Sequence, residues 1–308
     1  MNHKNSFFEK QPLSIKKQLE LLSSRGLIIK NYNAAYHHLQ FISYYRFCGY
    51  ASAFELTSIS GKKLYQKDTN FEQVLDYYVF DRKLRLLVID AIERIEIAIR
   101  TVIINELALR YGAHWYMNNT LFLKKFDHSA LINTVKKETL YHAQHGSVQH
   151  KKRERFIQHY FDKYQEPILP AIWMIAEVLS LGVWSLIFAN LVDRGNQKMI
   201  CQYFGINYKI MTSWLHCITY LRNLCVHHGR LWNRSFTLKP LIANNYRKQL
   251  KYNSNFSAQA AILKIFLNII SPGNHCGRQL YQLIKEHQGI DVRKMGFTEN
   301  WHKDSFWS

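Results

Sequence analysis

Three residue types that can act together on a phosphate ester, an arginine, an asparagine and a histidine, stand in the run RNLCVHHG at 222–229. Metal-free cleavage of RNA needs one group to deprotonate the 2′-hydroxyl and another to protonate the leaving 5′-oxygen. It also needs a cation to stabilise the crowded phosphorane. Imidazole titrates near neutral pH and suits the proton transfers, so Arg222, Asn223 and His227 are the candidate residues. An R-x4-H spacing by itself is weak evidence, because it arises by chance in many helices.

These residues must be positioned by a helix that the sequence predicts from about Asn207 to His227, with Gly229 as its stop. Arg222 falls in the middle of the apolar stripe of this helix. A guanidinium there is costly unless it holds an anion or is paired, for instance with a carboxylate of the helix at 82–102. Arg222 and His227 point about 140° apart on a continuous helix, so two copies across a two-fold axis would assemble a shared site. The apolar stripe comprises Met211, Trp214, Leu215, Ile218, Leu221 and Cys225.

A stripe of charge follows the helix at 82–102, part of the longest predicted helix, from about Phe71 to Tyr111. At about 100° per residue, six side chains fall within an arc of about 80°: Arg82, Arg85, Ile89, Glu93, Glu96 and Arg100. One interpretation is a solvated face with ion pairs, such as Glu96 with Arg100. The other is a row of arginines that meets phosphates and is oriented by glutamates. The stripe taken alone favours the solvated face.

The composition predicts long helices and a polyanionic partner. Of 308 residues 47% are apolar, 13 are Gly and 5 are Pro, so the chain is neither disordered nor rich in short strands. With 41 Lys and Arg against 22 Asp and Glu, the formal charge is +19, which indicates nucleic acid or, less often, an anionic membrane surface. Five cysteines without a C-x-x-C pair predict reduced, mostly buried thiols in a cytoplasmic protein. They are Cys48, Cys201, Cys217, Cys225 and Cys276.

Helices are also predicted before the charged stripe. Residues 13–24 carry apolar side chains at helical spacing, with Ser14 as the N-cap and Gly26 as the end. Residues 33–56 are expected to form a second, tyrosine-rich helical stretch. The polar residues 57–70 are expected to form a loop.

Two later segments differ from their surroundings. The segment 124–166 is basic and rich in histidine, and we expect a partly helical excursion from the core. In the apolar segment 167–192 the only charged residue is Glu177, and this length could cross a bilayer. Glu177 near its middle favours a buried hairpin or a central helix, so no membrane partner is expected. Residues 256–288 are expected to form two further helices.

Three groups of polar residues are open to two interpretations each. Histidines without cysteine or acidic partners at ligand spacing favour a solvated loop over a metal site: His142, His145 and His150. The basic run KKRER at 151–155 is a solvated face or a contact to the RNA backbone. Residues just past the 207–227 helix either stack and pair with RNA or anchor packing: Arg230, Trp232 and Arg234.

The run RNLCVHHGRLWNR at 222–234 closely resembles the signature of the Abi family of bacterial abortive-infection proteins, the AbiD and AbiF group. Further matching blocks follow in order along most of the chain: LSIKKQLELLSSRGLII (13–29), HHLQFISYYRFCGYASAF (37–54), FDRKLRLLVIDAIERIEIAIRT (80–101), PILPAIWMIAEVLSLGVWS (167–185) and the terminal MGFTENW. The family is similar to the HEPN superfamily, helical proteins whose ribonuclease members carry R-x4-6-H with a polar residue after the arginine.

The resemblance implies a metal-independent endoribonuclease, active as a homodimer in phage defence or as the toxin of a toxin–antitoxin system. It implies catalytic roles for Arg222, Asn223 and His227, and neither a cofactor nor a metal. RNA contacts are expected from basic residues beside the motif, on the helix at 82–102 and in the basic run: His228, Arg230, Arg234, Arg94, Arg100, Lys151, Lys152 and Arg153. The expected partners are RNA, a second copy of the chain, and a small non-coding RNA or a protein antitoxin. The rival is a non-catalytic RNA-binding protein that senses or sequesters a small RNA, but such binding has no need of histidine.

The expected architecture is all-α, an HEPN-like helical bundle with additional N- and C-terminal helices. Residues 13–240 are expected to form the helical domain, with the excursion at about 124–166. Residues 241–308 are expected to form a helical extension packed on this core. In the expected reaction His227 is the general acid/base, Arg222 stabilises the phosphate charge, and Asn223 orients the histidine or the phosphate.

Overall fold

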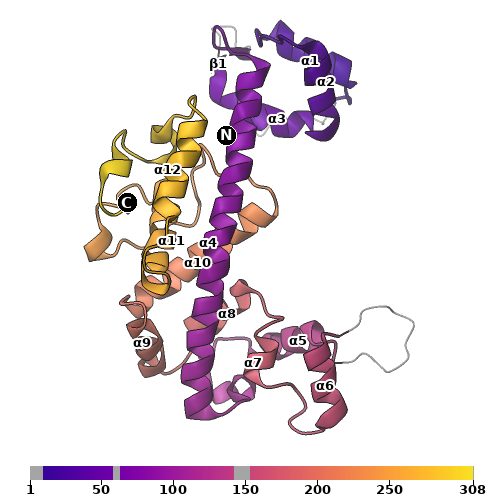
Figure 1. Cartoon of the computed structure of the whole chain (residues 1–308). Coiled ribbons are helices and arrows are strands. Elements are labelled where there is room, and N and C mark those ends of the chain that lie inside the picture. Colours follow the sequence, from indigo (N-terminus) through magenta and orange to yellow (C-terminus); the bar gives the residue numbers. More distant parts are fainter. Residues whose placement is uncertain (1–9, 58–62, 142–152, 308) are drawn as a thin grey trace, which may run out of the picture. The chain divides into compact units, whose positions relative to one another are not determined.

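The computed structural model describes residues 10–57, 63–141 and 153–307, and within these ranges the fold is all-α, as predicted (Figure 1). The described residues form twelve α-helices and one two-stranded sheet. The chain divides into two compact units, the first formed by 1–84 with 282–291 and the second by 85–281 with 292–308.

Three short helices begin the first unit: α1 (Ile15–Ser24), α2 (Tyr32–Phe41) and α3 (Tyr44–Ala51). The hydroxyl of Ser14 accepts a hydrogen bond from the backbone N–H of Lys17 at 3.3 Å, and Gly26 follows α1 with a φ of +92°. Both predicted ends of this helix are therefore confirmed. α1 packs against α2 and buries Leu19 and Leu22.

The tyrosine-rich pattern predicts one helical stretch over 33–56. The structure has two helices there, because local capping interrupts the stretch. α2 ends at an extended residue, and the hydroxyl of Ser43 then caps the first turn of α3. After α3, strand β1 (Glu55–Thr57) pairs antiparallel with β2 (Lys63–Tyr65). Part of the predicted loop 57–70 is thus the second strand of a β-hairpin.

Helix α4 (Phe71–Tyr111) is the longest, and its bounds agree with the range that the periodicity predicts (Figure 1). It begins where the side chain of Asn70 accepts a hydrogen bond from the backbone N–H of Gln73 at 2.8 Å. It ends before Gly112, which has a φ of +85°. The helix contributes residues up to Leu84 to the first unit and later residues to the second.

The first unit is completed by the end of α12 (Cys276–Glu286) and the residues that follow it. There the buried imidazole of His287 lies 2.7 Å from the carboxylate of Asp76 on α4. This pair fastens residues 282–291 to the first unit, whereas the rest of the expected extension 241–308 belongs to the second. The extension is therefore shared between the two units.

The second unit is built around one buried helix. Its helices, besides parts of α4 and α12, are α5 (His128–Glu138), α6 (Arg155–Lys163), α7 (Ile172–Ile175), α8 (Leu181–Asn190), α9 (Arg194–Gln202), α10 (Tyr208–Val226) and α11 (Phe256–Ile270). Every residue of α11 from Phe256 to Leu267 is buried, and α10 packs against α8, α9 and α11. A helix that is buried on every side lies at the centre of its unit, so α11 is the core element. The prediction of two helices within 256–288 is confirmed by α11 and α12.

The apolar segment 167–192 folds as two short helices, α7 and α8, rather than as one continuous helix. α8 buries Trp184, Ile187 and Phe188 in the second unit. Among the described residues, no helix combines the length and the apolar character that a membrane crossing requires.

The basic segment 124–166 is partly helical, as predicted, with α5 and α6; its residues 142–152 lie outside the described ranges. α6 packs against α7 and buries Ile157 and Tyr160, and the Nε2 atom of His128 lies 2.8 Å from a backbone carbonyl oxygen. The described part of the segment is therefore packed into the second unit.

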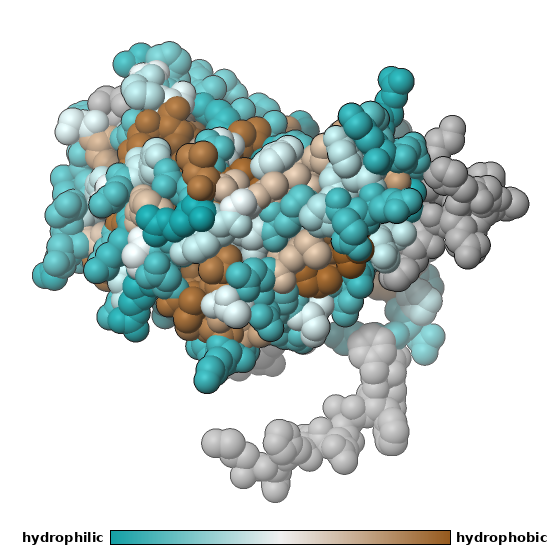
Figure 2. Space-filling view, turned by 90° about the horizontal axis from the view of Figure 1, so that it is seen from below, coloured by the Kyte–Doolittle hydropathy of each residue, from teal (hydrophilic) through white to brown (hydrophobic). Residues whose placement is uncertain are grey.

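The cysteines are mostly buried, whereas several large apolar side chains lie on the surface. All five cysteines are free, and three of them are buried, which agrees with the prediction. Seen from below, the surface shows apolar residues set among hydrophilic ones (Figure 2). The exposed apolar side chains of the second unit include Leu109, Trp173 and Leu186. Scattered apolar residues of this kind are ordinary on a folded surface.

Candidate functional site

The three candidate catalytic residues lie near the C-terminal end of α10. This helix runs from Tyr208 to Val226, within one residue of each predicted end. Arg222 and Asn223 stand in its last turns, and His227 is the C-cap. The apolar stripe beneath them is buried in full: Met211, Trp214, Leu215, Ile218, Leu221 and Cys225. A rigid, packed helix therefore carries the candidate residues.

α10 ends in a Schellman motif that places His228, not glycine, in the left-handed position. The N–H of His228 donates to the carbonyl of Cys225 at 3.0 Å, and the N–H of Gly229 donates to the carbonyl of Leu224 at 2.7 Å. The φ of His228 is +57°, a conformation that costs a residue with a Cβ about 1–2 kcal/mol. The left-handed residue that ends the helix is therefore His228, one position before the predicted stop at Gly229. This strained residue directly follows His227.

The side chains of the motif differ in exposure. Arg222 is half-buried, whereas Asn223 and His227 are exposed. The guanidinium of Arg222 lies 3.4 Å from the side-chain oxygen of Asn223, longer than the usual 2.7–3.2 Å of such hydrogen bonds. In this arrangement Asn223 lies against the arginine, and a weak contact of this length yields readily to an incoming phosphate.

The charge of Arg222 affects the pKa of a carboxyl on α4, that of Glu96. Burial raises the pKa of Glu96 on α4, and Arg222 is the strongest of the influences that lower it. Arg100 and the backbone N–H of Leu181, the first residue of α8, act in the same direction. Glu96 is therefore a carboxylate within electrostatic reach of Arg222, although the two side chains do not form an ion pair.

Two arginines of the charged stripe on α4 are engaged with the protein, whereas Arg82 and Glu93 are exposed. The Arg100 guanidinium lies 3.0 Å from the carboxylate of Glu177 and donates to the carbonyl of Ala176 at 3.1 Å. Arg85 is only 5% exposed and donates to the carbonyl of Gly229 at 3.4 Å. The solvated-face interpretation is therefore wrong for these two arginines, because carbonyls and a carboxylate distant in sequence receive them.

Three further residues around the motif are held by the protein. Arg94 pairs with Asp90 one turn earlier at 2.7 Å. Arg234 donates to the backbone carbonyl of Arg230 at 3.1 Å. Trp232 is only 1% exposed, so it anchors packing and the alternative of stacking on RNA is wrong for this residue.

The basic run at 151–155 is described from Arg153 onward, and Lys151 and Lys152 lie outside the described residues. The guanidinium of Arg153 donates to the carbonyl of Leu140 at 2.8 Å and to the side chain of Gln158 at 3.1 Å. It also lies over the ring of Phe161, 4.7 Å from the centroid. Arg153 thus joins the end of α5 to α6.

Metal-ligating side chains do not gather in the described part of the chain. No group of three or more histidine, cysteine, aspartate or glutamate residues lies there in an arrangement that holds a metal ion. The polar-loop histidines lie outside the described residues: His142, His145 and His150.

Sequence reasoning missed the contribution of the α7–α8 region to this site. Glu177 and the N–H of Leu181 both act on the charges of α4. One signal pointed to Glu177, because a lone charge within an apolar segment needs a partner. No signal in the sequence pointed to the backbone of Leu181.

Comparison with known protein families places most of the chain. A family model described as Abi-like protein matches residues 37–233, more than half of the chain. The matched region contains the candidate residues of α10 together with Glu96, Arg100 and Glu177. No curated protein and no solved structure matches the chain.

Proposed function

Because the chain belongs to the Abi-like protein family, as its resemblance predicted, we propose that it is an endoribonuclease of phage defence or of a toxin–antitoxin system. The observation that carries the proposal is the placement of Arg222, Asn223 and His227 at one end of α10, with the histidine exposed and the arginine half-buried. A formal charge of +19 supports RNA as the partner, since phosphates neutralise such charge.

The proposed reaction is a transesterification within the RNA chain. The 2′-oxygen attacks the adjacent phosphorus, a 2′-O–P bond forms, and the P–O5′ bond breaks. An imidazole of His227 accepts the 2′-hydroxyl proton, and an imidazolium returns a proton to the leaving 5′-oxygen. Arg222 stabilises the negative charge of the phosphorane. The products are a 2′,3′-cyclic phosphate and a 5′-hydroxyl, and no metal takes part.

In the proposed homodimer, the arginine and the histidine of one active site come from different subunits, because they point apart within one copy. Arg222 and His227 are five residues apart, so their side chains point about 140° apart around the helix. A two-fold axis near the end of α10 would bring the arginine of one copy toward the histidine of the other. Val226, the last helical residue, is an apolar side chain left 44% exposed between them, as suits an interface.

The second candidate function is non-catalytic binding of a small RNA. The charge of Arg222 lowers the pKa of Glu96, which favours this candidate, because an arginine that acts on a protein carboxylate can serve structure or anion binding without a histidine. Both candidates predict RNA affinity that falls steeply with salt, by a logarithmic slope of about −0.7 per phosphate contacted on single strands. A measurement of RNA cleavage therefore distinguishes the endoribonuclease from the non-catalytic RNA-binding protein.

The test uses purified protein and 5′-labelled single-stranded RNA, with and without excess chelator. Cleavage is expected to survive chelation, to leave a 2′,3′-cyclic phosphate, and to follow imidazole titration between about pH 5 and 8. His227→Ala should lower the rate about 100-fold or more while RNA binding stays nearly intact. Arg222→Ala should lower both cleavage and binding.

The matched control is His216→Ala, because His216 is an exposed histidine on the same helix. Its rate should equal that of the unchanged protein. Cleavage abolished by chelator and unaffected by His227→Ala would contradict the mechanism. RNA binding without any cleavage would favour the non-catalytic candidate.

A further inference from the structure

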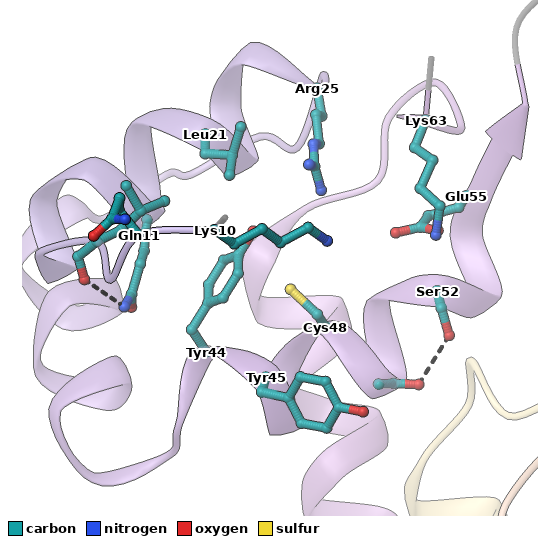
Figure 3. Close-up of a pocket in the computed structure, with 13 residues that line it drawn as sticks. Lys10, Gln11, Leu21, Arg25, Tyr44, Tyr45, Cys48, Ser52, Glu55 and Lys63 are labelled. Carbon is teal, nitrogen blue, oxygen red and sulfur yellow. Dashed lines mark hydrogen bonds and ion pairs between the residues drawn. The ribbon is translucent and has the colours of Figure 1, made fainter. Parts of the chain in front are cut away.

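An open pocket of about 890 Å³ lies in the first unit, among the segment that precedes α1, α1 itself, α3 and the β-hairpin (Figure 3). This volume is within the range of about 300–1,000 Å³ that small-molecule sites occupy. The pocket contains none of the residues of the candidate cleavage site. Its ligand has to be inferred from its own lining.

Three cations line the pocket against one carboxylate. Lys63 lies 3.0 Å from Glu55, so this pair is internally balanced. The side chains of Lys10 and Arg25 both reach into the same space (Figure 3), and neither forms an ion pair with another described residue. The pocket therefore presents two cationic groups without an ion-pair partner among the described residues, and an anion with several oxygens would supply the counter-charge.

Arg25 is held in place before any ligand arrives. It is the C-cap of α1, where its N–H donates to the carbonyl of Leu22 at 3.2 Å. Its carbonyl accepts a hydrogen bond from the N–H of Tyr65 in β2 at 2.8 Å. Burial and a hydrogen bond with Cys48 raise the pKa of Tyr44 to about 12, while the positive charge of Arg25 opposes this rise. The backbone of Arg25 is thus fixed by α1 and β2, and its guanidinium points into the pocket (Figure 3).

Two tyrosine rings stand beside these cations at the start of α3. Tyr44 is half-buried and lies beneath Lys10, where its ring forms part of the wall (Figure 3). Tyr45 follows at the rim and is 90% exposed. An aromatic ring held at the mouth of a pocket, with its face in water, offers a stacking surface that every nucleobase can use.

We propose that this pocket binds a nucleotide, with its phosphate on Arg25 and Lys10 and its base stacked on Tyr45. Inorganic phosphate would use the cations but leave the exposed ring without a role. A free mononucleotide and one nucleotide of a single-stranded RNA present the same chemistry, a phosphate next to a base. The inference does not depend on RNA cleavage, because the pocket and the candidate cleavage site share no residue.

The experiment measures binding by calorimetry to the full chain carrying Arg222→Ala, which removes the main candidate cation of the cleavage site. The probes are AMP, GMP, CMP and UMP, inorganic phosphate, and a five-nucleotide single-stranded RNA. Arg25→Gln added to this protein should weaken nucleotide binding at least about tenfold, because a charge-assisted hydrogen bond is lost. Tyr45→Ala should weaken nucleotide binding but leave the affinity for inorganic phosphate unchanged.

Matched controls lie in the same unit outside the pocket. Lys17→Gln removes an exposed cation of α1, and Phe41→Ala removes a ring that is 79% exposed on α2; both should bind nucleotides normally. Circular dichroism should show all variants folded. Binding of mononucleotides would identify a free ligand, whereas binding of the RNA alone, with the same dependence on Arg25 and Tyr45, would identify a nucleotide within a strand. The proposal fails if neither probe depends on these two residues, or if inorganic phosphate binds as tightly as the nucleotides.

Discussion

The positive charge of Arg222 on α10 lowers the pKa of Glu96 on α4, so a charge on one helix of the second unit acts on a carboxyl of another. Burial raises the pKa of the Glu96 carboxyl, and the charge of Arg222 opposes that rise more strongly than any other group. Arg85, one of the few buried charged residues, braces the same end of α10 through the carbonyl of Gly229. α4 therefore contacts the end of α10 through Arg85, and its Glu96 lies within electrostatic reach of Arg222.

The raised pKa of Glu96 predicts that stability decreases as pH rises. The folded chain holds the carboxyl proton more tightly than the unfolded chain, so it binds more protons above the ordinary value of 4.5. The contribution of Glu96 is fully present below that pH and is lost as pH rises through the higher folded value. Glu96→Gln should therefore flatten the fall in unfolding free energy, measured by urea unfolding from about pH 4 to 7. Glu20→Gln, which removes an exposed carboxyl of α1 that does not act on Glu96, should keep the original slope. An equally steep fall in Glu96→Gln would contradict the assignment.

A shared site predicts complementation between subunits. Arg222→Ala and His227→Ala proteins should each be inactive alone, but their mixture should recover cleavage after subunit exchange, because one of the two composite sites in a mixed dimer keeps both groups. The measurement is the initial rate of RNA cleavage against the mixing ratio. A mixture of His227→Ala with His227→Ala,Arg222→Ala should stay inactive. Full activity of a strictly monomeric protein would refute the shared site.

The left-handed residue at the end of α10 predicts a stabilising substitution. His228→Gly should raise the free energy of unfolding by about 0.5–1 kcal/mol, because glycine adopts a positive φ without steric cost. Chemical denaturation gives the value. His216→Gly, in the middle of the same helix, should instead lower it by about 1 kcal/mol. If His228→Gly brings no gain, the interactions of the imidazole offset the backbone strain.

A close approach of two backbones predicts a strongly destabilising substitution in α12. A Cβ at Gly277 would overlap the carbonyl oxygen of Trp307, and a backbone atom cannot swing away as a side chain does. Gly277→Ala should cost about 2–3 kcal/mol of unfolding free energy. Gly49→Ala is the control, because a Cβ at that helical position meets nothing within 4 Å and should stabilise α3. A neutral Gly277→Ala would mean that the C-terminal residues are not packed on α12.

The contacts of Arg153 predict a structural role in place of the expected RNA contact. Arg153→Ala should lower the unfolding free energy by about 1–2 kcal/mol, because the carbonyl of Leu140 and the side chain of Gln158 lose their donor. RNA affinity and its salt dependence should change little. Arg155→Ala removes an exposed arginine of α6 and should leave stability unchanged. A large loss of RNA affinity in Arg153→Ala would restore the RNA-contact interpretation.

Local signals predicted the helices that carry the site. The bounds of α4 agree with its apolar periodicity, and α10 agrees to within one residue, because a long amphipathic pattern and its ends are properties of neighbouring residues. The same reasoning failed for 33–56, where the hydroxyl of Ser43 restarts the helix and a short hairpin follows. Capping and turn chemistry outweigh periodicity over such short stretches.

The sequence by itself determined that an arginine, an asparagine and a histidine stand at the end of one helix in a strongly basic chain, and which family this chain resembles. Only the tertiary structure decided which partners these charges have. Arg100 meets Glu177 across 77 positions of sequence, and Arg85 meets Gly229 across 144. Such contacts depend on how distant helices pack, which periodicity within a single helix does not encode. The same packing buried Trp232 and gathered Lys10, Arg25 and Tyr45 around one pocket.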